Sequence, residues 1–231
     1  MRTYVGLDIG TTKVAVVIAE PDEDGSLKVV GVGHAPSSGL RRGVVVHLEN
    51  TVQSIRAAVQ EAERMAGVPV RRVTAGIAGE HIRSVNSRGV IAVSRNGSEI
   101  GGDDVARVVE AARAVAIPGD REVLHVIPQE YVVDDQSGIR DPIGMSGVRL
   151  EAEVHIVTGA STSARNLQKA VERAGLKVDA FVLEPLAAAR AVLSSDEREL
   201  GCLIIDLGGG TTNVALYYEG AIRHTAVIGL G

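Results

Sequence analysis

The sequence predicts an α/β protein with two groups of strands and a small module inserted between them. Three observations predict this class. Short β-branched runs alternate with stretches of helical periodicity along the 231 residues. Residues 80–158 follow a different pattern from their surroundings, and one glycine-rich turn recurs near both ends of the chain. The length suits one or two domains and is enough to bury a core.

The first part of the chain is predicted to form three strands, a helix and a fourth strand. The helix is expected to begin at Asn50, with Gln53 completing a capping box, and to end before Gly67. Its apolar residues recur at helical spacing. The strands are expected at residues 3–9, 13–19, 27–34 and 73–77.

The middle part, residues 80–158, is predicted to be an α+β module. A helix is expected over residues 103–116. Apolar and polar residues alternate over residues 150–156, which predicts a strand with one wet face in an antiparallel or edge position. Residues 134–147 are rich in turn formers and are expected to form a surface loop, a candidate docking surface.

The last part is predicted to hold two further helices and the remaining strands. One helix begins near residue 161 and ends at Gly175, and another begins at Pro185, a favoured first helical residue. The chain ends in Val-Ile-Gly-Leu-Gly without a helix cap or a polar tail, so we expect the natural protein to continue. The strands are expected at residues 177–183, 202–206, 214–218 and 221–228.

Composition and charge exclude several classes of protein. The chain carries 24 Lys and Arg against 29 Asp and Glu, a formal net charge of −5. It has no apolar run of about 18 residues that would span a membrane and no basic-then-apolar leader. The single cysteine, Cys202, fits a reducing cytoplasm. Four tyrosines and one phenylalanine leave almost no stacking platform, so no nucleic-acid partner is expected.

One short segment occurs twice. Residues 8–16 (DIGTTKVAV) match residues 206–216 (DLGGGTTNVAL), with two extra glycines in the second copy. Each copy has an aspartate at the end of a buried-looking strand, then a Gly/Thr turn, then another strand. Such a turn exposes backbone N–H groups and hydroxyls to phosphate oxygens, and Asp8 and Asp206 can hold Mg²⁺, usually through water. Two hairpins facing across a cleft would grip a polyphosphate, as phosphoryl chemistry requires.

Turn chemistry alone is the alternative explanation, because Asp-x-Gly segments also make ordinary hairpins. Two matched copies, each with Asp, Gly and paired Thr, favour phosphate binding over that alternative. Neither copy is a Walker A loop or a G-x-G-x-x-G fingerprint.

These residues resemble the actin/hexokinase/DnaK-type ATPase superfamily and, within it, the FtsA family of bacterial cell-division proteins. Asp8–Lys13 resembles the first phosphate motif of the superfamily, Asp206–Thr212 the second, and Glu184–Ala189 the motif that connects them. Two segments of the inserted module are more specific to FtsA than the phosphate loops. The segments that resemble FtsA are GLDIGTTKVAVVIAE, EHIRSVNSRGVIAVS, HVIPQEYVVDDQSGIRDPIGMSGVRLEAEVHIVTGA and LIIDLGGGTTNVALYYEG.

The resemblance implies an α/β, actin-like (ribonuclease H-like) ATPase fold. Residues 1–79 and 159–200 would form subdomain 1A, residues 80–158 the inserted FtsA-type α+β subdomain 1C, and residues 201–231 the first hairpin of a truncated subdomain 2A. FtsA chains continue well beyond this point. The FtsZ-binding subdomain 2B, the adenosine-binding motif and a C-terminal amphipathic membrane helix would lie downstream.

The resemblance also implies a function. FtsA proteins bind ATP with Mg²⁺, polymerise, and link the FtsZ ring to the cytoplasmic membrane together with other division proteins. The chain is therefore expected to be cytoplasmic, and in the full-length protein to lie at the cytoplasmic face of the membrane at the division site. As an enzyme it would be at most a slow ATPase.

Residue by residue, the resemblance implies a nucleotide site. Asp8 and Asp206 would position Mg²⁺ and its waters. Glu184 would orient water or metal as the catalytic residue, or would simply accept from N–H groups at its helix start. Lys13 would neutralise phosphate charge, or is a solvated lysine at a strand start. The phosphates would be held by Gly10, Thr11, Thr12 and Lys13 on one side and by Gly208, Gly209, Gly210, Thr211 and Thr212 on the other.

Asn213 departs from the family pattern, which commonly has Asp after the second Thr-Thr pair. The lost charge bears on metal affinity or turnover, while the amide can preserve the hydrogen bonds of the turn.

Two other functions stay open. A metabolic kinase of the same superfamily would need an acceptor-hydroxyl site with a general base, and the sequence shows no such constellation. A partner-binding module that works without nucleotide is the other, because half of the expected cleft lies outside this sequence.

Overall fold

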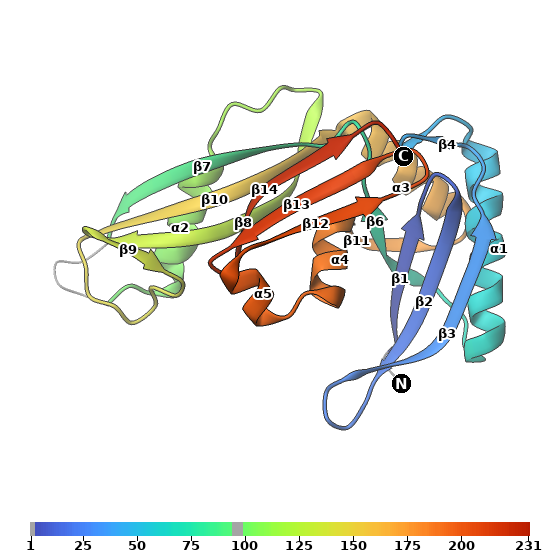
Figure 1. Cartoon of the computed structure of the whole chain (residues 1–231), viewed down its shortest axis with the longest axis horizontal. Helices are drawn as coiled ribbons and strands as arrows, with labels where there is room; N and C mark the ends of the chain where they lie inside the picture. The colour runs from blue at the N-terminus through green and yellow to red at the C-terminus, as the bar shows by residue number, and fades with distance from the viewer. Residues whose placement is uncertain (1–2, 94–98) are drawn as a thin grey trace.

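The computed structural model describes residues 3–93 and 99–231. Residues 1–2, at the start of the predicted subdomain 1A, and residues 94–98, in the predicted inserted module, lie outside the described residues. In the described part, the strands form a five-stranded, a four-stranded and a three-stranded sheet, together with one short pair (Figure 1). None of the helices in this part has the length and apolar character needed to cross a membrane.

The first sheet has the strand order β11-β6-β1-β2-β3, and helices α1 and α3 pack together against it. β1 pairs antiparallel with β2 and parallel with β6. The predicted βββαβ order is therefore present. The elements of this part are β1 (Tyr4–Ile9), β2 (Lys13–Pro21), β3 (Leu27–Pro36), β4 (Leu40–Arg41), β5 (Val44–Val45), α1 (Leu48–Ala66), β6 (Arg72–Ile77), α3 (Ser161–Arg173) and β11 (Lys177–Leu183).

Helix α1 begins and ends for different reasons. Its end at Gly67 follows the prediction, since Gly67 is left-handed with φ 70°. The predicted cap at Asn50 is wrong. The helix begins earlier, because the His47 ring accepts a hydrogen bond from the Asn50 backbone N–H at 3.3 Å, so a histidine takes the role expected of an asparagine.

A glycine lets α1 lie very close to the edge of the first sheet. A Cβ atom at Gly33 on β3 would lie 2.0 Å from the carbonyl oxygen of Ala58 and 2.5 Å from the backbone nitrogen of Ala62. The strand therefore rests directly on the helix backbone. Gly89 on β7 does the same in the second sheet, where a Cβ would lie 2.3 Å from the backbone nitrogen of Ala112.

The second sheet has the order β7-β10-β8-β9 and is entirely antiparallel. Helix α2 ends at Arg113 instead of residue 116, and part of the predicted surface loop over residues 134–147 is the strand β9. The elements are β7 (Arg83–Ala92), α2 (Gly102–Arg113), β8 (Arg121–Val133), β9 (Gln136–Ile139) and β10 (Arg149–Ala160).

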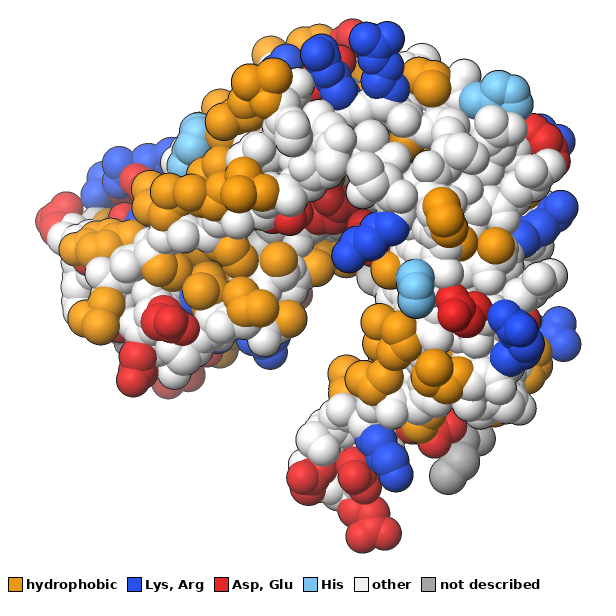
Figure 2. Space-filling model, turned by 45° about the vertical axis from the view of Figure 1, so that its right-hand side comes forward, with side chains coloured by type: hydrophobic (Ala, Val, Ile, Leu, Met, Phe, Trp, Pro, Cys, Tyr) orange, Lys and Arg blue, Asp and Glu red, His pale blue; other side chains and the backbone are white. Residues whose placement is uncertain are grey.

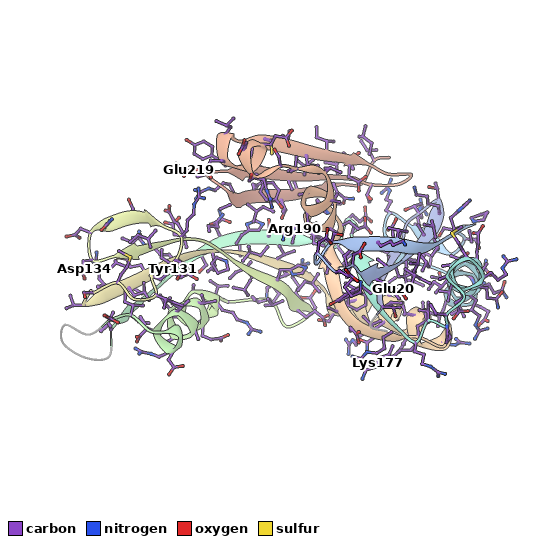
Figure 3. All side chains as sticks on the ribbon, turned by 90° about the horizontal axis from the view of Figure 1, so that it is seen from below. Glu20, Tyr131, Asp134, Lys177, Arg190 and Glu219 are labelled. Carbon is purple, nitrogen blue, oxygen red and sulfur yellow. The ribbon has the colours of Figure 1, made fainter. Side chains whose placement is uncertain are left out.

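The third sheet, β12-β13-β14, stacks on the second, with side chains between them (Figure 3). Because α2 covers one face of β10 and β14 the other, the predicted wet face of β10 is wrong, although its antiparallel pairing is confirmed. The elements are α4 (Glu184–Val192), α5 (Ser195–Leu200), β12 (Cys202–Leu207), β13 (Thr212–Tyr218) and β14 (Ala221–Ile228).

Two polar residues of β10, Glu151 and His155, are buried, and both have partners. Glu151 forms ion pairs with Arg88 and Arg149. His155, which is 1% exposed, contacts the Asn86 side-chain oxygen at 2.6 Å and the Thr225 hydroxyl at 2.9 Å. Burial, with a smaller contribution from His224, lowers the pKa of His155 to about 4.

We predict that Gly33→Ala destabilises the protein by roughly 1–3 kcal/mol, because the added methyl group has to displace helix backbone. Urea unfolding measures the change. Gly102→Ala is the matched control, since a Cβ at Gly102 meets nothing within 4 Å, and we expect it to be neutral or stabilising. Equal stability of the two variants would show that α1 yields at no cost.

The protein should lose stability in mild acid through His155. The folded state keeps this ring neutral. The contribution of His155 to the free energy of unfolding is therefore fully present above the ordinary pKa of 6.5 and falls as the pH drops towards about 4. The expected loss from His155 between about pH 7.5 and about pH 5 is roughly 2 kcal/mol. Urea unfolding across this range should give a shallower curve for His155→Gln and an unchanged curve for the control His34→Gln, an exposed ring. Parallel curves for His155→Gln and wild type would contradict this assignment.

Candidate functional site

The turns of the β1–β2 and β12–β13 hairpins have the same length. Asp8 pairs with Ala15, and Asp206 pairs with Asn213. Both turns are closed by the same hydrogen bond, from Gly10 N–H to the carbonyl of Lys13 and from Gly208 N–H to the carbonyl of Thr211, each at 2.9 Å. The alignment with two extra glycines is therefore wrong, because the closing bond fixes the turn length whichever residues fill it.

The two turns lie against each other. A Cβ atom at Gly209 would lie 2.2 Å from the Thr12 methyl carbon, and one at Gly210 would lie 2.9 Å from the Thr11 hydroxyl oxygen. The threonines of the first turn thus occupy the space that side chains of the second turn would need. This close approach explains why the second turn is glycine-rich.

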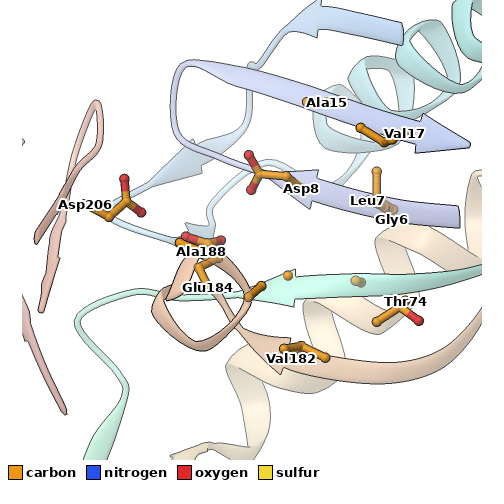
Figure 4. Close-up of a pocket in the computed structure, with 13 residues that line it drawn as sticks. Gly6, Leu7, Asp8, Ala15, Val17, Thr74, Val182, Glu184, Ala188 and Asp206 are labelled. Carbon is orange, nitrogen blue, oxygen red and sulfur yellow. The ribbon is translucent and has the colours of Figure 1, made fainter. Parts of the chain in front are cut away.

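Three carboxylates from different elements surround one pocket of about 430 Å³. Asp8 comes from the end of β1, Asp206 from β12 and Glu184 from the start of α4 (Figure 4). Figure 2 shows acidic side chains at the inner end of a notch between the two arms of the molecule. Gly76 leaves room beside two of them, since a Cβ there would lie 3.2 Å from the Glu184 Cγ and 3.7 Å from an Asp8 oxygen.

The pocket holds more negative charge than its surroundings neutralise. Burial raises the pKa of Glu184, and the charges of Asp8 and Asp206 raise it further. Burial also raises the pKa of Asp8, against which the nearby Lys13 ammonium acts. The contact between the Glu184 and Asp8 side chains raises the pKa of Glu184 further and acts to lower that of Asp8. Such crowding of carboxyl groups is typical of a site that receives a cation or does proton chemistry.

The other predicted phosphate residues differ in how free they are. Thr12 and Lys13 are exposed beside the first turn, while Thr211 is buried. Thr212 lies within β13, opposite Leu207, and its hydroxyl donates to the carbonyl of Leu230 at 2.9 Å. In this arrangement Thr212 is bonded to the chain itself and not left open for a ligand.

Sequence reasoning missed two features of the site. The pocket extends over apolar residues of the first sheet, including Ala15 and Val17, which carry no motif. The side-chain amide of Asn213 donates to an Asp206 oxygen at 3.3 Å, where a bond to the turn was expected. The equal spacing from each aspartate to its cross-strand partner was the signal that would have found this bond.

The residues fit a hydrated magnesium ion better than a directly ligated metal. Within residues 3–93 and 99–231, no group of three or more His, Cys, Asp or Glu side chains is placed to hold a metal ion. Asp8, Glu184 and Asp206 nevertheless share a pocket that has room for water. Mg²⁺ commonly keeps several waters and takes one or two carboxylates.

Sequence comparisons relate the chain to one family along nearly its whole length. Residues 79–158 match the model of the SHS2 domain inserted in FtsA. The chain is 55% identical to cell division protein FtsA of Pseudomonas aeruginosa over 98% of its residues, and 45% identical to that of Escherichia coli over 98%. In both cases it covers 54% of the relative, so it spans about half the length of the curated relatives it matches. The resemblance to FtsA is confirmed.

Solved structures relate the chain to one fold. It is similar to a chain of the PilM-PilN type IV pilus biogenesis complex, with a TM-score of 0.71 and 16% identity, covering 99% of this chain and 62% of that chain. It is also similar to the ethanolamine utilization protein EutJ from Carboxydothermus hydrogenoformans, with a TM-score of 0.56 and 19% identity, covering 100% of this chain and 53% of that one. The expected actin-like fold is confirmed.

We predict that Asp8→Asn stabilises the metal-free protein by about 1 kcal/mol, because it removes one negative charge from three crowded carboxyl groups. Urea unfolding in EDTA measures this change. Adding excess MgCl₂ should stabilise the wild type and leave the variant unaffected. Glu23→Gln, on the exposed β2–β3 turn, is the control and should match the wild type in both buffers. A destabilised Asp8→Asn would mean that neighbouring groups already neutralise the negative charge in the pocket.

Proposed function

We propose that this chain, which is FtsA-like along nearly its whole length, is part of a bacterial cell-division protein that binds ATP with Mg²⁺. One observation carries the proposal: two hairpins of equal length meet at their turns and place Asp8 and Asp206 on one pocket with Glu184. The confirmed actin-like fold, an ATPase fold, supports nucleotide binding.

Each hairpin supplies a separate part of the phosphate site. The backbone N–H groups of the turns around Thr11 and Gly209 would face phosphate oxygens, and the Lys13 ammonium would balance their charge. Asp8 and Asp206 would hold the waters of the ion. When bound, Mg²⁺ would neutralise charge on the phosphates. A ligand that enters here has to part the turns, because they touch in this arrangement.

Glu184 is the candidate group for water activation. It lies partly exposed at the start of α4, and its raised pKa keeps a proton on it beside Asp8. In its ionised form, the Glu184 carboxylate would accept a proton from water. This arrangement supports at most a slow ATPase. It offers no second general base for an acceptor hydroxyl, which disfavours a metabolic kinase.

The three sheets are proposed to correspond to the expected subdomains. The five-stranded sheet with α1 and α3 would be subdomain 1A, the four-stranded sheet with α2 subdomain 1C, and the three-stranded sheet the start of subdomain 2A. The FtsA relatives are named as cell division proteins. We extend this to self-association and to linking the FtsZ ring to the cytoplasmic face of the membrane. FtsZ binding and membrane attachment would require segments outside this sequence.

Calorimetric titration tests the nucleotide site. We predict that ATP binds wild-type protein measurably more tightly with Mg²⁺ than in EDTA, and that Asp8→Ala abolishes this difference while circular dichroism shows an unchanged fold. Glu23→Gln is the matched control, because it removes an exposed charge that does not line the pocket.

Three results would count against the proposal. Equal ATP affinity with and without Mg²⁺ in the wild type would leave the carboxylates without their assigned role. Nucleotide-independent binding of division proteins, with no response to ATP, would favour the partner-binding module instead. Transfer of phosphate from ATP to a small metabolite would favour the kinase.

A further inference from the structure

The two hairpins hold their aspartates in different ways. The residue opposite Asp8 is Ala15, whose methyl group offers no hydrogen bond, and Asp8 instead lies beside Glu184 in the pocket. The residue opposite Asp206 is Asn213, whose side-chain nitrogen donates to an Asp206 oxygen at 3.3 Å. The second aspartate therefore has a dedicated amide that the first one lacks.

Asn213 is bonded through only one end of its amide. Its side chain is 1% exposed, and its carbonyl oxygen is buried without a hydrogen-bond partner. Rotating the amide would place this oxygen against the Asp206 carboxylate, so electrostatics fixes the nitrogen on that side. Buried polar atoms are nearly always paired. An amide that leaves one atom unpaired is poorly suited to filling a core, and its bond to Asp206 is what it contributes.

We propose that Asn213 is a positioning residue that holds the Asp206 carboxylate ready for a hydrated divalent cation. The inference rests on the proposed function. The Asn213 amide holds one Asp206 oxygen and limits the rotation of the carboxylate. An aspartate at position 213 would place a like charge directly across the strands. Asn213 thus orients Asp206 without adding a further negative charge to a pocket that already has three carboxylates.

Binding of Mn²⁺ alone tests the inference, with electron paramagnetic resonance counting free Mn²⁺ and excess Mg²⁺ displacing the bound ion. We expect one Mg²⁺-displaceable site in the wild type. Asn213→Ala and Asn213→Leu should weaken Mn²⁺ binding roughly tenfold or more, as loss of groups that orient metal ligands commonly does. Asn86→Ala is the control, because Asn86 is an amide that bonds His155 and the Arg223 carbonyl instead of a pocket residue.

A stability measurement separates positioning from a merely structural role. Asn213→Leu removes the unpaired carbonyl together with the donor, so its thermal midpoint should equal or exceed that of the wild type while Mn²⁺ affinity falls. A lower midpoint in both variants, accompanied by weaker binding, would make Asn213 structural and overturn the inference.

The failure of the inference differs from the failure of the proposed function. Wild-type binding of Mn²⁺ with unchanged affinity in both Asn213 variants would overturn only the role of Asn213. Absence of any Mg²⁺-displaceable site in the wild type would overturn both.

Discussion

Three crowded carboxyl groups in one pocket are the constraint on which the rest of the site depends. Asp8, Asp206 and Glu184 come from three elements that are far apart in the sequence, so the fold has to carry the cost of bringing them together. Each is managed differently. Glu184 keeps a proton, Asp8 lies near Lys13, and Asp206 receives the Asn213 amide. Binding of a divalent cation, as proposed, would supply the positive charge that this pocket lacks.

Close packing at glycine recurs at three places in the molecule. Gly33 lets β3 touch α1, and Gly89 lets β7 touch α2, so both layers use the same device. The two turns use it a third time, where Gly209 lies against Thr12. In the first two cases the missing Cβ lets a strand touch a helix backbone, and in the third it leaves room for the Thr12 side chain. The high glycine content of the chain therefore reflects packing between elements as well as turn geometry.

Local signals in the sequence predicted most elements and singled out the three carboxylates that line one pocket, whereas long-range contacts decided the rest. The end of α1 at Gly67 was predictable because a left-handed helix end depends on the glycine at that one position. The wet face of β10 was mispredicted because covering by β14 comes from a strand far along the chain. The Asn213 bond was missed because the alignment matched Thr-Thr pairs, whereas the structure matches distances from each aspartate.

Strand β14 is tied at both ends. Near one end the carbonyl of Leu230 receives the Thr212 hydroxyl beside the second turn, and at the other the carbonyls of Ile222 and Arg223 are held by side chains of the second sheet. Hydrogen bonds of this strand therefore connect the glycine turn to the inserted sheet. Any motion that separates the turns to admit a ligand must also displace β14. Such a motion would either move the inserted sheet or break the hydrogen bonds between its side chains and the strand.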